Sequence, residues 1–243
     1  MARTAQEPNV VPLESARPRP ASPAPPTRDT RTFTQKRARA TYDALMRASA
    51  EVFAEKGFDA TQTPDIARHA GVSVGTFYRY FADKRQAFIE MIAEYLEQAY
   101  ESVMENLTPD AFAATRTARD KRAAVDHVID VLFRSAAEHP DLHFVFLAMS
   151  MRDPEVAEIR LRFEKRGRQA LAALIETVVP AGRIPDPMAA AEVIQLAAEE
   201  AATATAGGHG PAKSFERARA LRGALTDMIY RYVFGTEEVP PGE

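Results

Sequence analysis

The chain has 243 residues, of which 46% are hydrophobic and 27% charged, so it is long and apolar enough for one or two globular domains. It contains no cysteine, which excludes disulfides, thiolate metal sites and cysteine nucleophiles. The net charge of −3 is uneven, because residues 31–85 carry ten Lys or Arg against six Asp or Glu. A basic N-terminal third on an acidic remainder indicates a polyanionic partner for the first part only.

The first thirty residues differ in composition from all that follows. Residues 1–30 hold seven of the seventeen prolines and few large apolar side chains, which predicts a disordered tail. They also lack the apolar centre of a signal peptide, and no later apolar run approaches the roughly 18 residues of a membrane span. We therefore expect a cytoplasmic protein. Strand signals are missing after the tail, so the predicted fold class is all-α.

A first helix is predicted from Gln35 to Glu55, with apolar residues at helical spacing. Gly57 is the expected left-handed stop, and Phe58 is placed to fold back onto the last turn. A second helix begins with Thr63 as its cap, followed by proline and an acidic residue. It is short, because Gly71 follows eight residues after that cap.

Ser73 is the expected cap of a third helix running from Val74 to Tyr80, and Asp83 caps a fourth, with Gln86 three residues later. Three short helices with a glycine turn between the second and third predict a helix-turn-helix DNA-binding domain over residues 31–82. The spacing alone also fits any small helical bundle. Phe77 and Phe81 are expected to face inward.

The segment Ile66–Lys84, IARHAGVSVGTFYRYFADK, resembles the DNA-binding segment of the tetracycline-repressor (TetR) family, as does the lead-in AEVFAEKGF at Ala50–Phe58. The resemblance covers about residues 36–90. It implies base contacts for Val74, Gly75 and Tyr78, and phosphate contacts for Thr63, Thr76, Tyr80 and Lys84. Ser73 and Arg79 belong to the same predicted DNA-binding set. Lys36, Arg37 and Arg39 form either a DNA-contacting arm or a solvated charge cluster.

A C-terminal helical domain is predicted over residues 83–243, with helices at about 83–107, 121–138, 141–151, 154–179, 186–206 and 214–234. The segment 141–151 is apolar nearly all round and is expected to be buried. The family resemblance implies an apolar ligand cavity here, lined by Phe133, His143, Phe146, Met149 and Phe163. The alternative is an ordinary packed core, with His143 as a hydrogen-bonded core histidine.

The last two predicted helices have the composition of an interface. Residues 186–206 are rich in alanine, which permits close helix approach but is also simply a good helix former. In a TetR-like protein these helices pair with their symmetry mates as a four-helix dimer interface. The stripe expected to form it is Leu221, Leu225, Met228, Ile229 and Tyr232.

These observations favour a homodimeric, ligand-responsive DNA-binding transcriptional regulator, with a repressor released from a palindromic operator by a small apolar or aromatic effector as the leading form. The expected partners are double-stranded DNA, a second copy of the chain and that effector, with no cofactor. A helical-bundle enzyme is the alternative of another class, but no Glu-x-x-His pair, phosphate loop or H-E-x-x-H occurs. His139 and His143 are four residues apart, yet Pro140 separates them, so no metal site is expected. A TetR-like sensor that has lost DNA binding is the remaining alternative.

Overall fold

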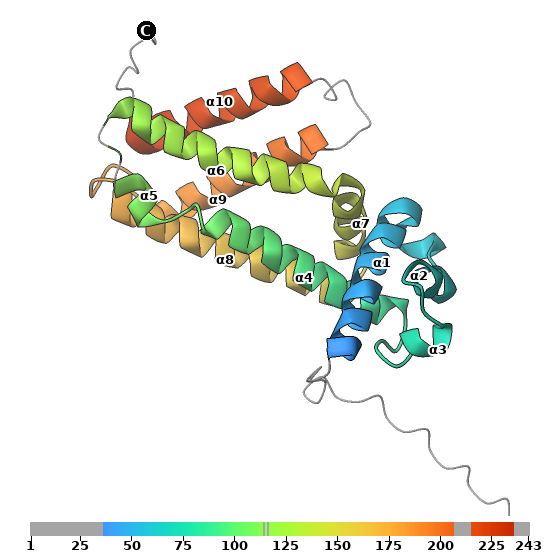
Figure 1. Ribbon diagram of the computed structural model, residues 1–243. Coiled ribbons are helices and arrows are strands. Elements are labelled where there is room, and N and C mark those ends of the chain that lie inside the picture. Colours follow the sequence, from blue (N-terminus) through green and yellow to red (C-terminus); the bar gives the residue numbers. More distant parts are fainter. Residues whose placement is uncertain (1–35, 114, 116, 207–214, 236–243) are drawn as a thin grey trace, which may run out of the picture. The chain divides into compact units, whose positions relative to one another are not determined.

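The computed structural model describes residues 36–113, 115, 117–206 and 215–235, and these contain ten helices and no strand (Figure 1). The predicted disordered tail of residues 1–30 lies outside this range. The helices are, in chain order, α1 (Lys36–Ala60), α2 (Thr63–His69), α3 (Val74–Phe77), α4 (Lys84–Met104), α5 (Pro109–Ala113), α6 (Ala118–Glu138), α7 (Pro140–Ser150), α8 (Pro154–Val178), α9 (Pro187–Ala206) and α10 (Phe215–Phe234).

The end of α1 follows the sequence prediction. Gly57 has φ +74° and interrupts the helical backbone, as expected for a residue without a Cβ. Phe58 then folds back, so that its ring stacks on Phe53 with ring centroids 5.7 Å apart. Phe88 of α4 closes the cluster, with its ring edge-on to both other rings. The end of α1 is thus packed against the start of α4.

The helix-turn-helix is formed by α2, α3 and the turn between them. Gly71 has φ +68° in that turn, and the Ser73 hydroxyl caps α3 by accepting a hydrogen bond from the Thr76 amide at 3.1 Å. The start of α2 differs from the prediction, because Gln62 is its cap and Thr63 is already helical and buried. The Asp65 carboxylate accepts a hydrogen bond from the Gln62 amide instead. Regular α3 ends at Phe77, three residues before the predicted end.

The fourth helix connects the two parts of the fold. The Asp83 carboxylate caps α4 by accepting a hydrogen bond from the Gln86 amide at 2.8 Å, as predicted. The contacts of α4 are with α1, α6 and α8, and those with α8 run from Arg85 in the first turn of α4 to Glu97 farther along. Figure 1 shows α4 running beside α8 from the helix-turn-helix into the C-terminal helices. One helix, α4, therefore belongs both to the N-terminal helices and to the C-terminal helices.

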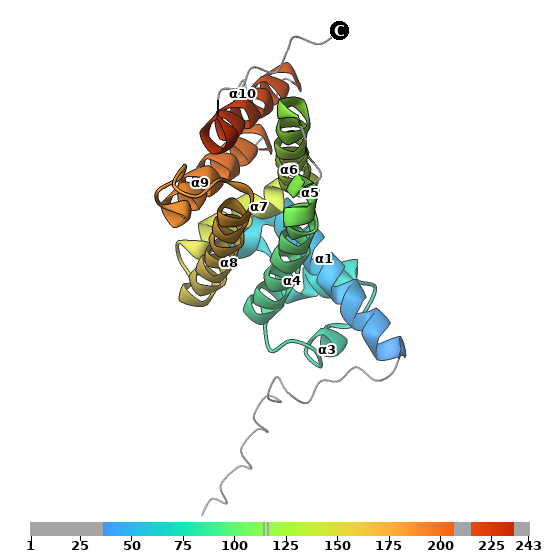
Figure 2. The same cartoon turned by 90° about the vertical axis from the view of Figure 1, so that its left-hand side faces the viewer.

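The C-terminal helices share one apolar core, which draws residues from α5, α6, α8, α9 and α10. Figure 2 shows α6, α8, α9 and α10 gathered in this part of the molecule. Their boundaries lie within about three residues of the predicted ones. The short α5 was not predicted, because five residues cannot display a hydrophobic period. In α7, Leu142, Phe146 and Met149 are buried whereas Phe144 is exposed, so this helix is less enclosed than its composition indicates.

None of the helices within the described ranges is long and apolar enough to cross a membrane.

Candidate nucleic-acid interface and ligand cavity

The outward face of α3 presents part of the predicted DNA-binding set. Val74, Gly75 and Arg79 are exposed, and the Tyr78 side chain is 54% exposed with its ring edge-on to buried Phe77. An added Cβ on Gly75 would meet nothing closer than 3.8 Å, so this backbone lies open to an approaching surface. Short helices that expose a phenol, a guanidinium and bare backbone can contact phosphates and base edges. Arg68, near the end of α2, was not among the predicted contacts; its side chain is exposed, and its guanidinium donates a hydrogen bond to Asp65 at 2.7 Å.

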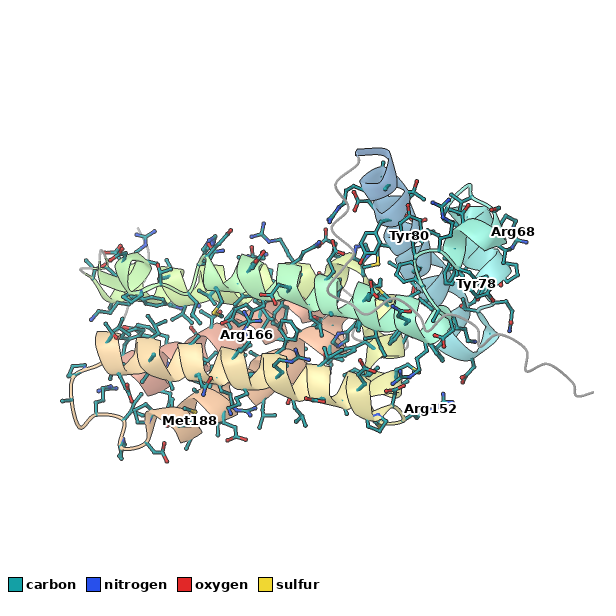
Figure 3. All side chains as sticks on the ribbon, turned by 90° about the horizontal axis from the view of Figure 1, so that it is seen from below. Arg68, Tyr78, Tyr80, Arg152, Arg166 and Met188 are labelled. Carbon is teal, nitrogen blue, oxygen red and sulfur yellow. The ribbon has the colours of Figure 1, made fainter. Side chains whose placement is uncertain are left out.

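Tyr80 does not face outward as a phosphate contact would. Its side chain is only 8% exposed, and its hydroxyl donates a hydrogen bond to the Ala38 carbonyl oxygen of α1 at 3.2 Å. Figure 3 shows Tyr80 toward α1, whereas Tyr78 and Arg68 lie toward the outer margin of α2 and α3. Because regular α3 ends before this position, the chain turns and carries Tyr80 inward. The structure thus places Tyr80 on the inner side of this turn, facing α1.

Lys84 likewise has a different place from the predicted phosphate contact. Its Nζ atom donates hydrogen bonds to three backbone carbonyl oxygens, those of Phe58 at 2.9 Å, Asp59 at 3.1 Å and Thr61 at 2.7 Å. It also lies 4.9 Å from the centre of the Phe58 ring. An ammonium group has three N–H bonds, so every donor is used inside the protein. Lys84 therefore stabilises the chain leaving α1, where carbonyls lack helical partners.

The remaining predicted contacts vary in accessibility. Thr63 is buried, which removes it from the outer surface, and the hydroxyl groups of Ser73 and Thr76 bond each other at 2.9 Å. Arg39 forms an exposed ion pair with Asp43 at 2.9 Å. The side chains of Lys36 and Arg37 lie outside the described part of the chain.

An apolar cavity of about 540 Å³ lies among the C-terminal helices. Residues from α4 through α10 line it, and the volume is typical of small-molecule sites. Three of the predicted residues are in its wall: His143, Phe146 and Phe163. Phe133 and Met149 are not in its wall; both are buried elsewhere, Phe133 in the shared core of the C-terminal helices. Tyr95 and Tyr100 of α4 also line the cavity, and neither was among the residues predicted from the sequence.

Polar side chains in the cavity wall come mainly from α7, α8 and α9. The His143 Nε2 atom lies 3.1 Å from the Thr203 hydroxyl, and burial, aided by the charge of Arg160, lowers the histidine pKa. Arg160 pairs with Glu164 at 2.6 Å on α8. On α9, Glu199 accepts a hydrogen bond from Gln195, and burial raises the Glu199 pKa. None of these polar residues except His143 was expected from the sequence.

The predicted dimer stripe on α10 divides between two faces. Leu225 and Ile229 are each 6% exposed in this chain's own core, so they are not available to a partner. Met228 and Tyr232 face outward, Tyr232 being 51% exposed, and Leu221 is half-buried. On the adjacent α9, Val193 and Leu196 are also exposed. Leu225 and Ile229 are buried because α10 packs on α6 and α9, which cover that face of the helix.

Two arginine–aspartate pairs join the end of α1 and the start of α4 to the chain that leads into α8. Arg85, in the first turn of α4, binds Asp153 through two hydrogen bonds of 2.6 and 2.8 Å. Asp153 is also the cap of α8. Arg152 binds Asp59, beyond the kink of α1, through bonds of 2.8 and 3.2 Å. Bidentate pairs of this kind add geometric specificity to the contact between the segments they join.

Among the described residues, no group of three or more His, Asp or Glu side chains is arranged to hold a metal ion.

Two family models match this chain. "Bacterial regulatory proteins, tetR family" matches residues 45–91, and "Tetracyclin repressor-like, C-terminal domain" matches residues 121–232. A curated relative, the fatty acid metabolism regulator protein of Bacillus subtilis, is 36% identical over 90 residues, or 37% of this chain and 44% of that protein. The alignments with this and the next two curated relatives span 44–66% of their lengths.

Solved structures share the fold. The regulator FadR from Bacillus subtilis, in complex with stearoyl-CoA, has a TM-score of 0.56 and 23% identity, covering 80% of this chain and 98% of that one. A protein described as a transcriptional regulator from Saccharomonospora viridis, in complex with choline, has a TM-score of 0.62 and 16% identity, covering 77% and 94%. The helix-turn-helix, the helical C-terminal domain and both family models lead to one conclusion. This chain belongs to the TetR family of transcriptional regulators.

Proposed function

We propose that this protein is a homodimeric transcriptional repressor that leaves a palindromic operator when a small apolar or aromatic effector enters the cavity. The observation that carries the proposal is the continuity of α4. This helix begins beside the helix-turn-helix and contributes Tyr95 and Tyr100 to the cavity wall. The proposed division is a DNA-binding domain at 31–82 and an effector and dimerisation domain at 83–243.

The DNA surface proposed here is smaller than the sequence indicated. It consists of Val74, Gly75, Thr76, Tyr78 and Arg79, with Arg68 added. Two such surfaces on one dimer can engage successive major grooves only when about 34–36 Å separates them. An effector that prefers another tilt of α4 changes that separation, and it shifts the equilibrium by its differential affinity for the two states.

The dimer surface proposed here is the exposed apolar face of α9 and α10, with Val193, Leu196, Met228 and Tyr232 at its centre. Exposed apolar patches on adjacent helices are typical of interfaces. Met228→Glu should give monomers that retain the helical content of the wild type, whereas Leu225→Glu should unfold the chain, because it buries a charge. Sedimentation and circular dichroism distinguish these outcomes. A wild-type monomer at micromolar concentration would exclude the dimer.

The similarity of this fold to solved structures does not identify the chemical class of the effector. One structural neighbour holds the anionic thioester stearoyl-CoA and another holds the cation choline, so the same fold accommodates opposite charges. The effector must therefore be inferred from the residues of this cavity. Its lining supports an apolar or aromatic body, since Phe146, Phe163 and Tyr100 all contribute to the wall.

The test of the proposal is direct. Genomic fragments retained by the protein would be sequenced to find the operator, and affinity measured by fluorescence anisotropy with and without effector. A coupling of roughly 5–150-fold is expected, with the same factor on effector affinity when operator is present. Failure to retain any fragment would favour the alternative of a sensor without DNA binding, to which the internal bonds of Tyr80 and Lys84 lend some support.

A further inference from the structure

The cavity wall contains two hydrogen-bond acceptors one helical turn apart on α9. The Gln195 side-chain amide donates from Nε2 to a Glu199 carboxylate oxygen at 2.7 Å. The other end of the same amide, Gln195 Oε1, is fully buried and has no hydrogen-bond partner within the described residues. Buried polar atoms without partners are rare in proteins and call for an explanation. Gln195 itself is one of the residues that line the apolar cavity.

Glu199 has no direct ion-pair partner either. Within the described residues no Lys or Arg forms an ion pair with it: Arg160 in the same wall binds Glu164, and the charges of Arg160 and Arg168 act on Glu199 only from a distance. Burial raises the Glu199 pKa, with the charge of Glu164 acting in the same direction and the Gln195 bond opposing. A partly buried carboxylate with one neutral donor is costly to ionise.

The formal charges of the cavity lining sum to a negative value. Glu164, Glu199 and Glu200 contribute three carboxylates against the single guanidinium of Arg160. His143 adds no compensating charge at neutral pH, because its pKa is lowered. Glu164 is paired with Arg160, and Glu200 is exposed. Glu199 is therefore the partly buried, unpaired carboxylate, and such a charge attracts cations and repels anions. A fatty carboxylate or an acyl phosphate would add a further negative charge to this wall.

We propose that the effector is an apolar molecule carrying an ammonium group, and that Glu199 and Gln195 Oε1 bind that group. This inference rests on the proposed function in taking the cavity as the effector site. The ammonium supplies what both acceptors lack, a positive charge for the carboxylate and a donor for the amide oxygen. The apolar remainder fills the cavity between α4, α6 and α8.

The experiment compares three ligands that differ only in their head group. Decylammonium, decanol and decanoate, below their micellar concentrations, would be titrated into the full-length protein by calorimetry without DNA. Decylammonium should bind at least about tenfold more tightly than decanol or decanoate. This ratio corresponds to a difference in binding free energy of ~1.4 kcal/mol. Glu199→Gln should remove this preference and leave decanol affinity unchanged. Glu192→Gln, on the exposed side of the same helix and outside the cavity wall, should retain it.

Other results overturn the inference. Equal affinity for decylammonium and decanol, tighter decanoate binding, or a preference that survives Glu199→Gln would each exclude ammonium recognition here, while the cavity remained an effector site. Binding of none of the three would exclude the inference, and an operator titration in the same preparation would show whether DNA binding holds independently. If Glu199→Gln does not fold, Gln195→Met removes the unpartnered oxygen and should also weaken decylammonium selectively.

Discussion

The helix-turn-helix and the C-terminal helices are packed in opposite ways. Around α1 to the start of α4, Phe53, Phe77, Phe81 and Phe88 are all completely buried, with rings in contact. The C-terminal helices surround a cavity of about 540 Å³. Tightly packed interiors transmit displacement as rigid units, whereas a void can be filled or reshaped at little cost. The difference is that the first region is packed without space to spare, whereas the C-terminal helices leave a space of small-molecule size among them.

The largest expected effect on stability comes from replacing one phenylalanine by alanine in each region and comparing the losses of unfolding free energy. Phe88→Ala should lower the free energy of unfolding by about 3–5 kcal/mol, because it removes a completely buried ring that contacts Phe53 and Phe58. Phe163→Ala, in the cavity wall, should cost about 1 kcal/mol, because its ring is half-buried beside existing empty space. Urea unfolding measures both. Similar losses would mean that the cavity does not loosen the C-terminal region.

Lys84 gives the next largest effect. Lys84→Ala should destabilise the protein by about 2 kcal/mol, since it removes the donor from three carbonyl oxygens after α1. Arg79→Ala is the matched control, because this exposed cation should leave the unfolding free energy unchanged while weakening DNA binding and lowering its salt slope by about one. An unchanged midpoint for Lys84→Ala, together with a lower salt slope, would restore Lys84 as a phosphate contact.

Smaller effects are expected at the two tyrosines that flank Arg79. Tyr80 should affect protein stability, whereas Tyr78 should affect DNA binding. Tyr80→Phe should cost about 1 kcal/mol of stability through loss of the Ala38 hydrogen bond. It should leave operator affinity unchanged at temperatures where the variant is folded. Tyr78→Ala should change stability by less than about 0.5 kcal/mol and weaken operator binding with relaxed base preference. Thermal melts and anisotropy on the same samples measure both quantities. Weaker operator binding by Tyr80→Phe, with lower stability of Tyr78→Ala, would contradict this assignment.

The smallest effect concerns the pH dependence of stability in the cavity. Burial raises the Glu199 pKa above its ordinary 4.5, so the folded protein binds this proton more tightly than the unfolded chain does. The stabilisation from proton binding is complete below pH 4.5 and is lost as the pH rises through the folded-state pKa. The melting temperature of Glu199→Gln relative to wild type should therefore rise between pH 4.5 and pH 8. If the difference in melting temperature between Glu199→Gln and the wild type does not change with pH, the Glu199 pKa is not raised by folding. Glu192→Gln, a variant of an exposed glutamate on the same helix, is the control.

Much of this molecule was predictable because its signals are local. The left-handed backbone of Gly57 and Gly71 and the caps supplied by Ser73 and Asp83 depend on residues within a turn of one another. The long helices have hydrophobic periods that persist over many turns, and these located α6, α8, α9 and α10 within a few residues. The resemblance of Ile66–Lys84 to the TetR family was what predicted DNA binding by this segment.

Tertiary packing decided what local patterns leave open. Periodicity shows that a helix has an apolar face but not which neighbour covers it, so Leu225 and Met228 looked equivalent until α6 and α9 covered one of them. In the same way, only the position of α1 brings carbonyl oxygens within reach of Tyr80 and Lys84. The sequence by itself determined the helices, the turn and the family. The accessible residues of the recognition surface and the cavity's polar lining depended on contacts between segments far apart in the chain, which no local rule encodes.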